Sequence, residues 1–345
     1  MTKAKPYEIS KQLVWDAYKK VKANRGAAGV DGQSLAAFEK DLKNNLYKIW
    51  NRMSSGSYFP PPVRLVKIPK GNTGATRPLG IPTVSDRIAQ MVVKLILEPQ
   101  LEPHFHPDSY GYRPGKSALD AVGVTRRRCW RQDWVIDLDI KGFFDNLSWD
   151  LVLKALRHHT DIPWILLYVE RWLKAPVQRT DGSLEERTKG SPQGAVISPL
   201  LSNLFMHYAF DEWLRRNFPR IQFARYADDA VIHARSLAEA EQVLEAVRSR
   251  LLECGLELHP EKTKVVYCQD SDRHGNHDHI QFDFLGYTFR PRRAKNRWGK
   301  PFVSFLPAVS NKAANSIRAT IRSWRLGATR NNLSLEEIAK FVNTY

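Results

Sequence analysis

Two adjacent carboxylates, Asp228 and Asp229, lie between two short apolar segments of the chain. The segments 223–224 and 230–232 predict two strands joined by a tight turn that carries both carboxylates. Like charges this close resist ionising together when they are shielded from water, and a divalent cation removes that cost. Hard carboxylate oxygens suit Mg²⁺. The pattern therefore indicates a magnesium site at a hairpin tip, and the alternative is an acidic surface turn.

A third carboxylate, Asp139, stands at the end of an apolar stretch over 134–140 that predicts a buried strand. Side chains alternate along a strand, so Asp137 and Asp139 share one face. If this strand lies beside the hairpin, three carboxylates could hold two metal ions ~3.5–4 Å apart, the two-metal arrangement for phosphoryl transfer. One ion would activate an attacking 3′-hydroxyl, and the other would stabilise the leaving pyrophosphate. For Asp137 we expect a salt-bridged structural role.

The charge of the chain points to nucleic acid as its partner. The 345 residues carry a net charge of +17, and residues 284–335 contain eleven Lys or Arg and no acidic residue. Phosphate backbones are the usual partner of such a stretch, because each neutralised phosphate releases condensed counterions. The alternative is a basic surface that is merely solvated. No apolar run approaches the ~20 residues that a membrane span needs, and three widely spaced cysteines predict inert thiols rather than a disulfide framework.

The elements around these residues predict an α+β fold, because strands and helices follow one another without regular β-α-β alternation. We expect helices in the first ~50 residues and a strand–loop–strand unit over 63–82 with basic residues near its tip. Further helices are expected at 86–97, 198–214 and 237–254, and strands at 264–267 and 286–289. Near the C-terminus, Ile317, Ile321 and Trp324 predict the apolar face of a last helix.

Several motifs in a fixed order resemble one enzyme family. Residues 226–229 (YADD) resemble the Tyr-x-Asp-Asp signature of reverse transcriptases. Other segments are similar to successive blocks of the group II intron family: 77–87 (RPLGIPTVSDR), 109–118 (SYGYRPGKSA), 139–146 (DIKGFFDN), 191–203 (SPQGAVISPLLSN), 262–264 (KTK) and 284–287 (FLGY). The order matches from about Arg64 to Phe289. The chain is therefore identified as similar to the bacterial type of group II intron-encoded reverse transcriptase/maturase.

This resemblance implies an α+β right-hand polymerase fold. The expected parts are an N-terminal helical extension (1–60), fingers (61–130), a palm (131–290, with fingers elements near 160–195) and the start of a helical thumb or maturase domain (291–345). The implied activity is RNA-directed DNA polymerisation, in which a primer 3′-hydroxyl is extended on an RNA template. The implied partners are group II intron RNA, an RNA template with a DNA primer, and dNTPs. We expect no membrane partner and a cytoplasmic, nucleoid-associated location, while the oligomeric state is not predicted.

The resemblance also implies roles for individual residues. Two Mg²⁺ ions, with Mn²⁺ as a substitute, would be held by Asp139, Asp228, Asp229 and the backbone carbonyl of Ile140. The residues implied in dNTP binding are Lys70, Arg77, Phe143, Phe144, Gln193 and Lys262. One of the two phenylalanines would be the steric gate that meets the sugar at its 2′ position, and the spacing leaves open which. The residues implied in RNA and template binding are Arg113, Lys116, Arg292, Arg293, Arg318, Arg322 and Arg325.

The chain departs from the full-length family in two places. It ends at Tyr345, before the expected thumb is complete, and it has Gly194-Ala195 where the family often has two glycines. Two other functions stay open. The chain could be an RNA-binding splicing maturase without significant polymerisation, or a domesticated reverse transcriptase of an immune system. An RNA-dependent RNA polymerase is disfavoured, because Phe143-Phe144 as a gate argues against ribonucleotides.

Overall fold

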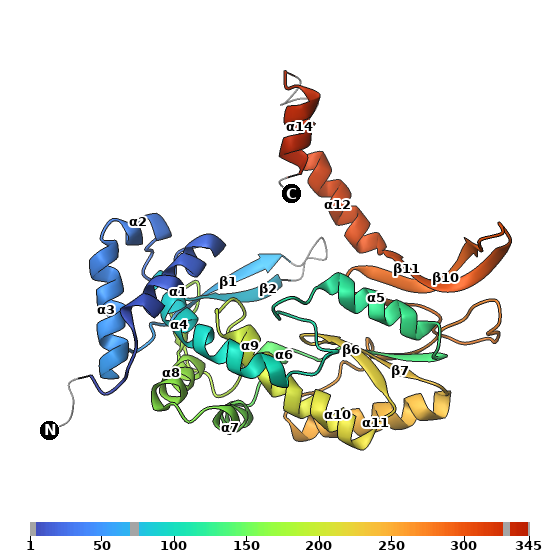
Figure 1. Cartoon of the computed structure of the whole chain (residues 1–345), viewed down its shortest axis with the longest axis horizontal. Coiled ribbons are helices and arrows are strands. Elements are labelled where there is room, and N and C mark those ends of the chain that lie inside the picture. The colour runs from blue at the N-terminus through green and yellow to red at the C-terminus, as the bar shows by residue number, and fades with distance from the viewer. Residues whose placement is uncertain (1–4, 70–75, 327–331, 344–345) are drawn as a thin grey trace.

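The computed structural model describes residues 5–69, 76–326 and 332–343 of the chain. Three helices open the fold: α1 (Lys11–Asn24), α2 (Leu35–Glu39) and α3 (Leu42–Ser55). Helix α1 buries Val14, Tyr18 and Val21, whose helical spacing makes one apolar face, and it packs on α4 (Val84–Leu101). Ser10 caps α1 by accepting a hydrogen bond from the Leu13 N–H at 3.1 Å. Figure 1 shows these helices at one end of the molecule.

Both strands of the predicted strand–loop–strand unit are present. Strands β1 (Val63–Pro69) and β2 (Thr76–Ile81) pair antiparallel. Two short strands, β4 (Val177–Gln178) and β5 (Leu184–Glu185), extend this sheet in the order β2-β1-β4-β5. Lys70, to which we assigned a role in dNTP binding, lies outside the described residues.

A second sheet forms the centre of the fold. Its antiparallel order is β6-β7-β3-β8, built from Gln222–Tyr226, Asp229–Ala234, Trp134–Leu138 and Lys264–Tyr267. Helix α11 (Leu237–Glu253) covers one face and α5 (Ala118–Cys129) the other (Figure 1). Ile136 and Leu138 pack in the cluster on the α11 side, whereas Val135 packs with the α5 side. The alternation predicted for this strand is confirmed.

Further helices complete the α11 side. They are α6 (Phe143–Asn146), α7 (Trp149–His159), α8 (Pro163–Lys174), α9 (Ser198–Met206) and α10 (Glu212–Asn217). The sequence predicted one helix over 198–214, but a π-helical turn, His207–Asp211, separates α9 from α10. Asp211 in that turn is fully buried. None of the helices in the described ranges has the length and apolar content needed to span a bilayer.

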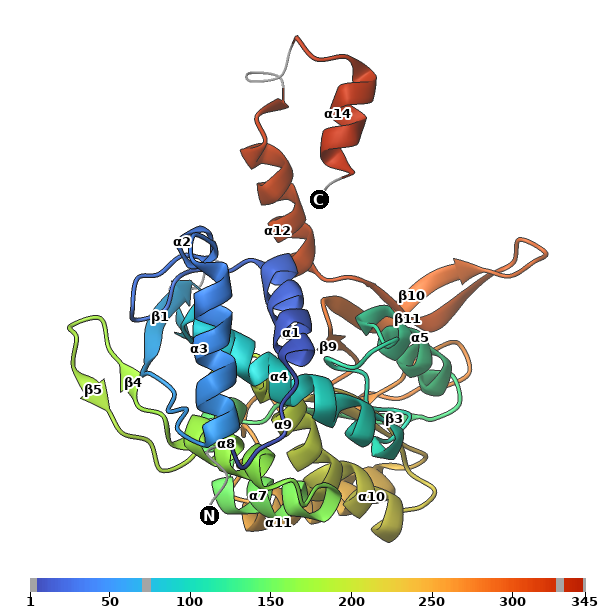
Figure 2. The same ribbon diagram turned by 60° about the vertical axis from the view of Figure 1, so that its left-hand side comes forward.

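The C-terminal part differs from the prediction. The strand expected at 286–289 continues as β10 (Tyr287–Lys295), which pairs with β9 (Phe282–Phe284) and β11 (Pro301–Val309). The domain boundary predicted at residue 290 therefore falls inside a strand. Stacked aromatic rings anchor the hairpin, with the centroids of Phe282 and Phe289 4.8 Å apart. The chain then leaves the body as α12 (Asn311–Ser323) and α14 (Leu335–Val342), which project away from it in both views (Figures 1 and 2).

A buried carboxyl joins the helices to the loop that carries Gln193. Asp86 on α4 is 1% exposed and accepts hydrogen bonds from the Tyr58 hydroxyl at 2.8 Å and the Trp172 indole at 2.7 Å. It also accepts from the Gln90 amide, whose oxygen in turn accepts from the backbone N–H of Val196 at 2.8 Å. Burial raises the pKa of Asp86 to about 6, against the opposing effect of these hydrogen bonds.

This raised pKa makes the stability of the fold depend on pH. The pKa of Asp86 is higher in the folded than in the unfolded chain, so its contribution is complete below about pH 4 and is lost as the pH rises through about 6. We expect the parent to lose about 3 kcal/mol of unfolding free energy over this window relative to Asp86→Asn. Denaturant unfolding at a series of pH values measures it, with the exposed Asp161→Asn as matched control. Parallel pH curves for the parent and Asp86→Asn would contradict this origin.

Candidate active site

The register of the central sheet brings the predicted carboxylates to one edge. In the β6–β7 hairpin Tyr226 pairs with Asp229, which leaves Ala227 and Asp228 as a two-residue turn. Strand β7 pairs with β3 so that Leu138 stands opposite Ala230. Asp139 comes one residue after Leu138, and Asp229 one residue before Ala230, so the two acidic residues continue the same register. The two strand units are neighbours, which is the condition on which the three-carboxylate site depends.

The field at this edge is strongly negative. Burial first, and then the negative charges of Asp229, Asp139 and Asp283 in that order, raise the pKa of Asp137 to about 8. Lys264 stands opposite Asp137 on β8 and acts in the other direction. Among the residues that the structure describes, no cation forms an ion pair with Asp137, so the predicted salt-bridged role is wrong. The raised pKa of its carboxyl instead shows that other acidic groups lie close to it.

Asp139 is held from two sides. Its backbone carbonyl accepts from the His259 N–H at 2.8 Å, and its own N–H donates to the Thr263 hydroxyl at 3.3 Å. The Lys262 ammonium lies 3.3 Å from its side-chain Oδ2. Lys262, which was predicted to bind the dNTP, therefore contacts Asp139, which was predicted to bind metal.

The carbonyl of Ile140 fits its predicted role. Hydrogen bonds to the opposite segment come from Asp139 and Lys141 on either side of it, while Ile140 forms the bridge to Leu258. Successive carbonyls of an extended chain point in opposite directions. That of Ile140 is therefore directed away from Leu258, toward the β7 side.

The chemistry of these donors fits Mg²⁺. All side-chain donors predicted for the ions are carboxylates, and a hard cation relieves their mutual repulsion. Within the described ranges, no three His, Cys, Asp or Glu side chains are gathered closely enough to enclose a metal ion. The sheet register brings the backbone segments of the predicted metal ligands together, but their side chains, as the structure describes them, do not enclose a metal site.

Beside the β2-β1-β4-β5 sheet, the basic side chain of Arg77 meets the amide side chain of Gln193. The Arg77 Nε donates to the side-chain oxygen of Gln193 at 2.6 Å, so two residues predicted for dNTP binding are in contact. The Gly80 N–H donates to the backbone carbonyl of Gln193 at 2.7 Å and fixes the 190–194 loop to β2. A hollow of about 410 Å³ lies beside this junction, and its lining includes Gln193, Asp145 and Lys189.

Both candidate gate residues are buried in α6. Phe143 is 2% and Phe144 6% exposed, and their rings meet edge to face with centroids 5.1 Å apart. A backbone contact distinguishes them. The carbonyl of Phe144 accepts from the Ser191 N–H at 2.7 Å, which ties this residue to the loop of Gln193.

Tyr112, to which the sequence assigned no role, lies near the predicted site residues. Its ring lies 6.0 Å from that of Tyr226. Burial raises its pKa, and the charges of Arg77 and Asp228 both act on it, the first lowering and the second raising the pKa. Tyr112 therefore stands between the two groups of predicted site residues. Its only signal in the sequence was its place within the 109–118 motif.

The side chains predicted to bind RNA differ in their exposure to solvent. The Arg113 side chain is only 6% exposed and pairs with Glu102 at 2.8 Å, while it also donates to the carbonyls of His106 and Ser109. Its predicted RNA contact is wrong, because the guanidinium is committed inside the protein. Lys116 and Arg292 are partly engaged by backbone carbonyls. The remaining four arginines, on β10 and around α12, are exposed: Arg293, Arg318, Arg322 and Arg325.

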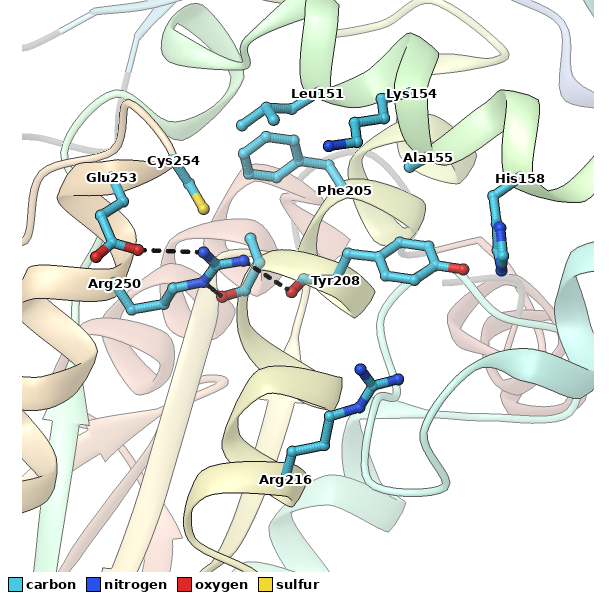
Figure 3. Close-up of a pocket in the computed structure, with 11 residues that line it drawn as sticks. Leu151, Lys154, Ala155, His158, Phe205, Tyr208, Arg216, Arg250, Glu253 and Cys254 are labelled. Atoms are coloured by element: carbon cyan, nitrogen blue, oxygen red, sulfur yellow. Dashed lines mark hydrogen bonds and ion pairs between the residues drawn. The ribbon is translucent and has the colours of Figure 1, made fainter.

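A separate hollow of about 510 Å³ lies among α7, α9, the π-helical turn and α11 (Figure 3). None of the predicted site residues lines it. Arg250 crosses its wall, pairing with Glu253 at 3.2 Å and donating to the carbonyls of Tyr208 and Ala209. These contacts join α11 to the π-helical turn, so Arg250 has a structural role there.

Comparisons with known proteins point to one family. A family model described as "Reverse transcriptase (RNA-dependent DNA polymerase)" matches residues 68–289. Protein YkfC of Escherichia coli is 31% identical over 339 residues, which cover 86% of this chain and 84% of that protein. The group II intron-encoded protein LtrA of Lactococcus lactis is 31% identical over 203 residues, or 58% of this chain and 33% of LtrA. This chain thus matches about a third of the length of LtrA.

Solved structures of telomerase share the fold. The Candida albicans enzyme superposes with a TM-score of 0.52 at 15% sequence identity, covering 74% of this chain and 48% of that one. At this identity the likeness concerns the fold alone, which is the α+β right-hand polymerase fold predicted from the sequence.

A close backbone contact beside the Asp228 turn yields a stability prediction. A Cβ on Gly111 would stand 2.5 Å from the backbone nitrogen of Ala227. We expect Gly111→Ala to lower the unfolding free energy by about 1–3 kcal/mol, because backbone atoms must move apart. Gly123→Ala in α5 is the control, since its Cβ would meet nothing closer than 3.9 Å. The control should gain ~0.5–1 kcal/mol in denaturant unfolding, as alanine favours a helix interior. Equal effects at both positions would contradict the contact.

Proposed function

Because the chain belongs to the reverse transcriptase (RNA-dependent DNA polymerase) family, we propose that it extends a primer 3′-hydroxyl on an RNA template. Its relatives include group II intron-encoded proteins and intron maturases. The observation that supports the proposal is the register of β3 and β7: Leu138 stands opposite Ala230, and Asp139 and Asp229 are the next residues along the two strands. Three acidic residues on neighbouring strand ends are what two-metal phosphoryl transfer needs.

The metal-binding role is assigned to Asp139, Asp228 and Asp229 together with the Ile140 carbonyl. When bound, two Mg²⁺ ions, or Mn²⁺ in their place, supply charge stabilisation for the attacking 3′-oxygen and the leaving pyrophosphate. The protein holds the strand ends that carry the donors. We assign Lys262, which lies beside Asp139, the role of donating a proton to the pyrophosphate.

The dNTP would bind between the two sheets. We assign Arg77 and Lys70 to the triphosphate, and Gln193 to the nucleotide that Arg77 helps to place. We assign the steric gate to Phe144, because its carbonyl is bonded to the loop of Gln193. Phe143 then belongs to the core below it.

The parts of the polymerase follow this assignment. We propose an N-terminal extension over 1–60, fingers over 61–130 and near 160–195, and a palm from residue 131. The palm ends near Ser310, because the β10–β11 hairpin packs on α5 and α12 starts just after Ser310. RNA would lie along the exposed cations Arg293, Arg318, Arg322 and Arg325. We assign Lys116 and Arg292 to the same RNA. Group II intron RNA is the proposed natural partner.

Removing one predicted metal ligand tests the polymerase function. We expect Asp228→Ala to reduce dNTP incorporation on a DNA-primed RNA template by about 10³-fold or more, because several kcal/mol of transition-state stabilisation depend on the ions. The exposed Asp161→Ala should retain the parent rate. A parent that extends and an Asp228→Ala variant within tenfold of it would exclude this site. A parent that binds structured RNA but never extends would favour a splicing maturase.

The gate assignment predicts a change in sugar selectivity. Phe144→Val opens space at the 2′ position, so we expect the preference for dNTP over rNTP to fall by about 10–100-fold. Phe143→Val removes a ring of the same size from the core and should lower the melting temperature without changing this preference. Competition between dNTP and rNTP on the same primer measures both. If only Phe143→Val alters the preference, the two roles are exchanged.

A further inference from the structure

A buried arginine stands directly before the turn that carries Asp228. Arg225 is the penultimate residue of β6, and its side chain is 0% exposed. Its guanidinium forms a two-pronged ion pair with Asp211 of the π-helical turn, at 2.7 Å from Nε and 2.6 Å from Nη2. A charge buried this completely persists only where it is fully paired and hydrogen-bonded.

Every N–H of this guanidinium has an acceptor. An arginine side chain has five such donors in a rigid fork. Two serve Asp211, and a third reaches the Ser109 hydroxyl at 2.9 Å. The remaining two come from Nη1 and reach the Asn203 side-chain oxygen at 3.1 Å and the backbone carbonyl of Ala227 at 2.9 Å. No lysine could satisfy this set, because an ammonium has only three donors and no planar fork.

The bond to Ala227 acts on the turn itself. Ala227 has a φ of 59°, in the left-handed region that residues with a Cβ seldom adopt. Its carbonyl belongs to the peptide that joins it to Asp228. By holding that oxygen, Arg225 fixes the plane from which the Asp228 side chain leaves the backbone.

The same turn is supported from its other side. The Arg225 backbone pairs with the segment 108–110, accepting from the Tyr110 N–H at 2.8 Å and donating to the Asp108 carbonyl at 2.9 Å. Asn203 on α9 joins the two supports, because its amide donates to the Gly111 carbonyl at 2.6 Å. Gly111 in turn lies against the backbone of Ala227. Helix α9, the π-helical turn and this segment therefore meet at one buried guanidinium.

We propose that Arg225 is a positioning residue for catalysis: held by Asp211 and Asn203, it sets the Ala227–Asp228 peptide and so the place where Asp228 presents its carboxylate. This inference rests on the proposed polymerase function and deepens it. The competing explanation is a buried ion pair that only stabilises the palm. The two differ in whether the loss of the guanidinium changes metal binding and turnover beyond what a loss of stability explains.

The test uses Arg225→Lys, which keeps the charge and removes the fork. We expect its kcat to fall on the order of 100-fold, while KM for dNTP stays near that of the parent, because the substrate contacts of the fingers are intact. Mn²⁺ binding, followed by the spin resonance of the free ion, should weaken about tenfold. Asn203→Ala is the milder second variant, should Arg225→Lys fold poorly, and should shift both quantities in the same direction.

Two controls separate positioning from stability. Leu251→Ala, in the buried face of α11, lowers stability without touching the turn, and Arg215→Lys makes the same exchange at an exposed ion pair. Both should bind Mn²⁺ as the parent does. Ala227→Gly combined with Arg225→Lys should recover part of the kcat, because glycine adopts the same φ without steric cost.

Equal kcat and Mn²⁺ affinity for Arg225→Lys and Leu251→Ala, compared at equal loss of melting temperature, would overturn the proposal. A parent that does not extend primers refutes the polymerase function, and the Mn²⁺ comparison then decides the positioning role alone. A parent that neither extends nor binds Mn²⁺ overturns both.

Discussion

The mutual repulsion of carboxylates at one edge of the central sheet is the constraint around which the fold is organised. The printed pairing of β3 with β7 ends with Leu138 opposite Ala230, and Asp139 and Asp229 are the next residues along the two strands. Side chains directly opposed in such a register would stand ~5 Å apart. Two such charges repel by about 3 kcal/mol at an effective dielectric constant of ~20. Asp137 and Asp283 add to the same field. Lys262 beside Asp139 and Lys264 opposite Asp137 act against this repulsion, and divalent cations bound at the edge would relieve it further.

A repulsive cluster keeps its geometry only if the backbone beneath it is rigid. Here each backbone segment that carries an acidic residue is hydrogen-bonded to a different part of the fold. The Asp139 backbone is bonded to His259 and Thr263, and the Asp228 turn rests on a fully satisfied buried guanidinium. On the opposite side, the Gln193 loop is bonded to β2 and, through Gln90, to the buried Asp86. The acidic edge and the basic fingers are thus fixed separately and meet around Tyr112.

Local patterns predicted most elements of the fold, because hydrophobic periodicity and turn-forming residues can be recognised within short segments. The strands at 63–69 and 264–267 and the helix over 237–253 form where the alternation and the final Gly255 indicated. No local pattern predicted the π-helical turn, whose Asp211 pairs with the distant Arg225. Strand β10 was cut short because its second half, Arg290 to Lys295, is basic and lacks the apolar alternation of a half-buried strand.

The candidate site shows the same division. The acidic residues and the Arg77–Gln193 pair could be named from motifs, since each motif is a contiguous segment. Arg113 was assigned to RNA because arginines are usually exposed, and its partner Glu102 is eleven residues away around a 3₁₀ turn. Asp137 was expected to pair with a cation, and only the three-dimensional structure shows that burial, followed by neighbouring acidic groups, raises its pKa.

The most direct test of this account is the position of the metal ions. Crystals of the chain with a primer–template and a non-reactive dNTP analogue, grown in Mn²⁺, would locate the ions by anomalous scattering. The account predicts peaks between Asp139 and the Asp228–Asp229 turn, within carboxylate coordination distance of ~2.0–2.6 Å. A bound nucleotide with no anomalous peak at this edge, or with the ions held by other residues, would contradict it.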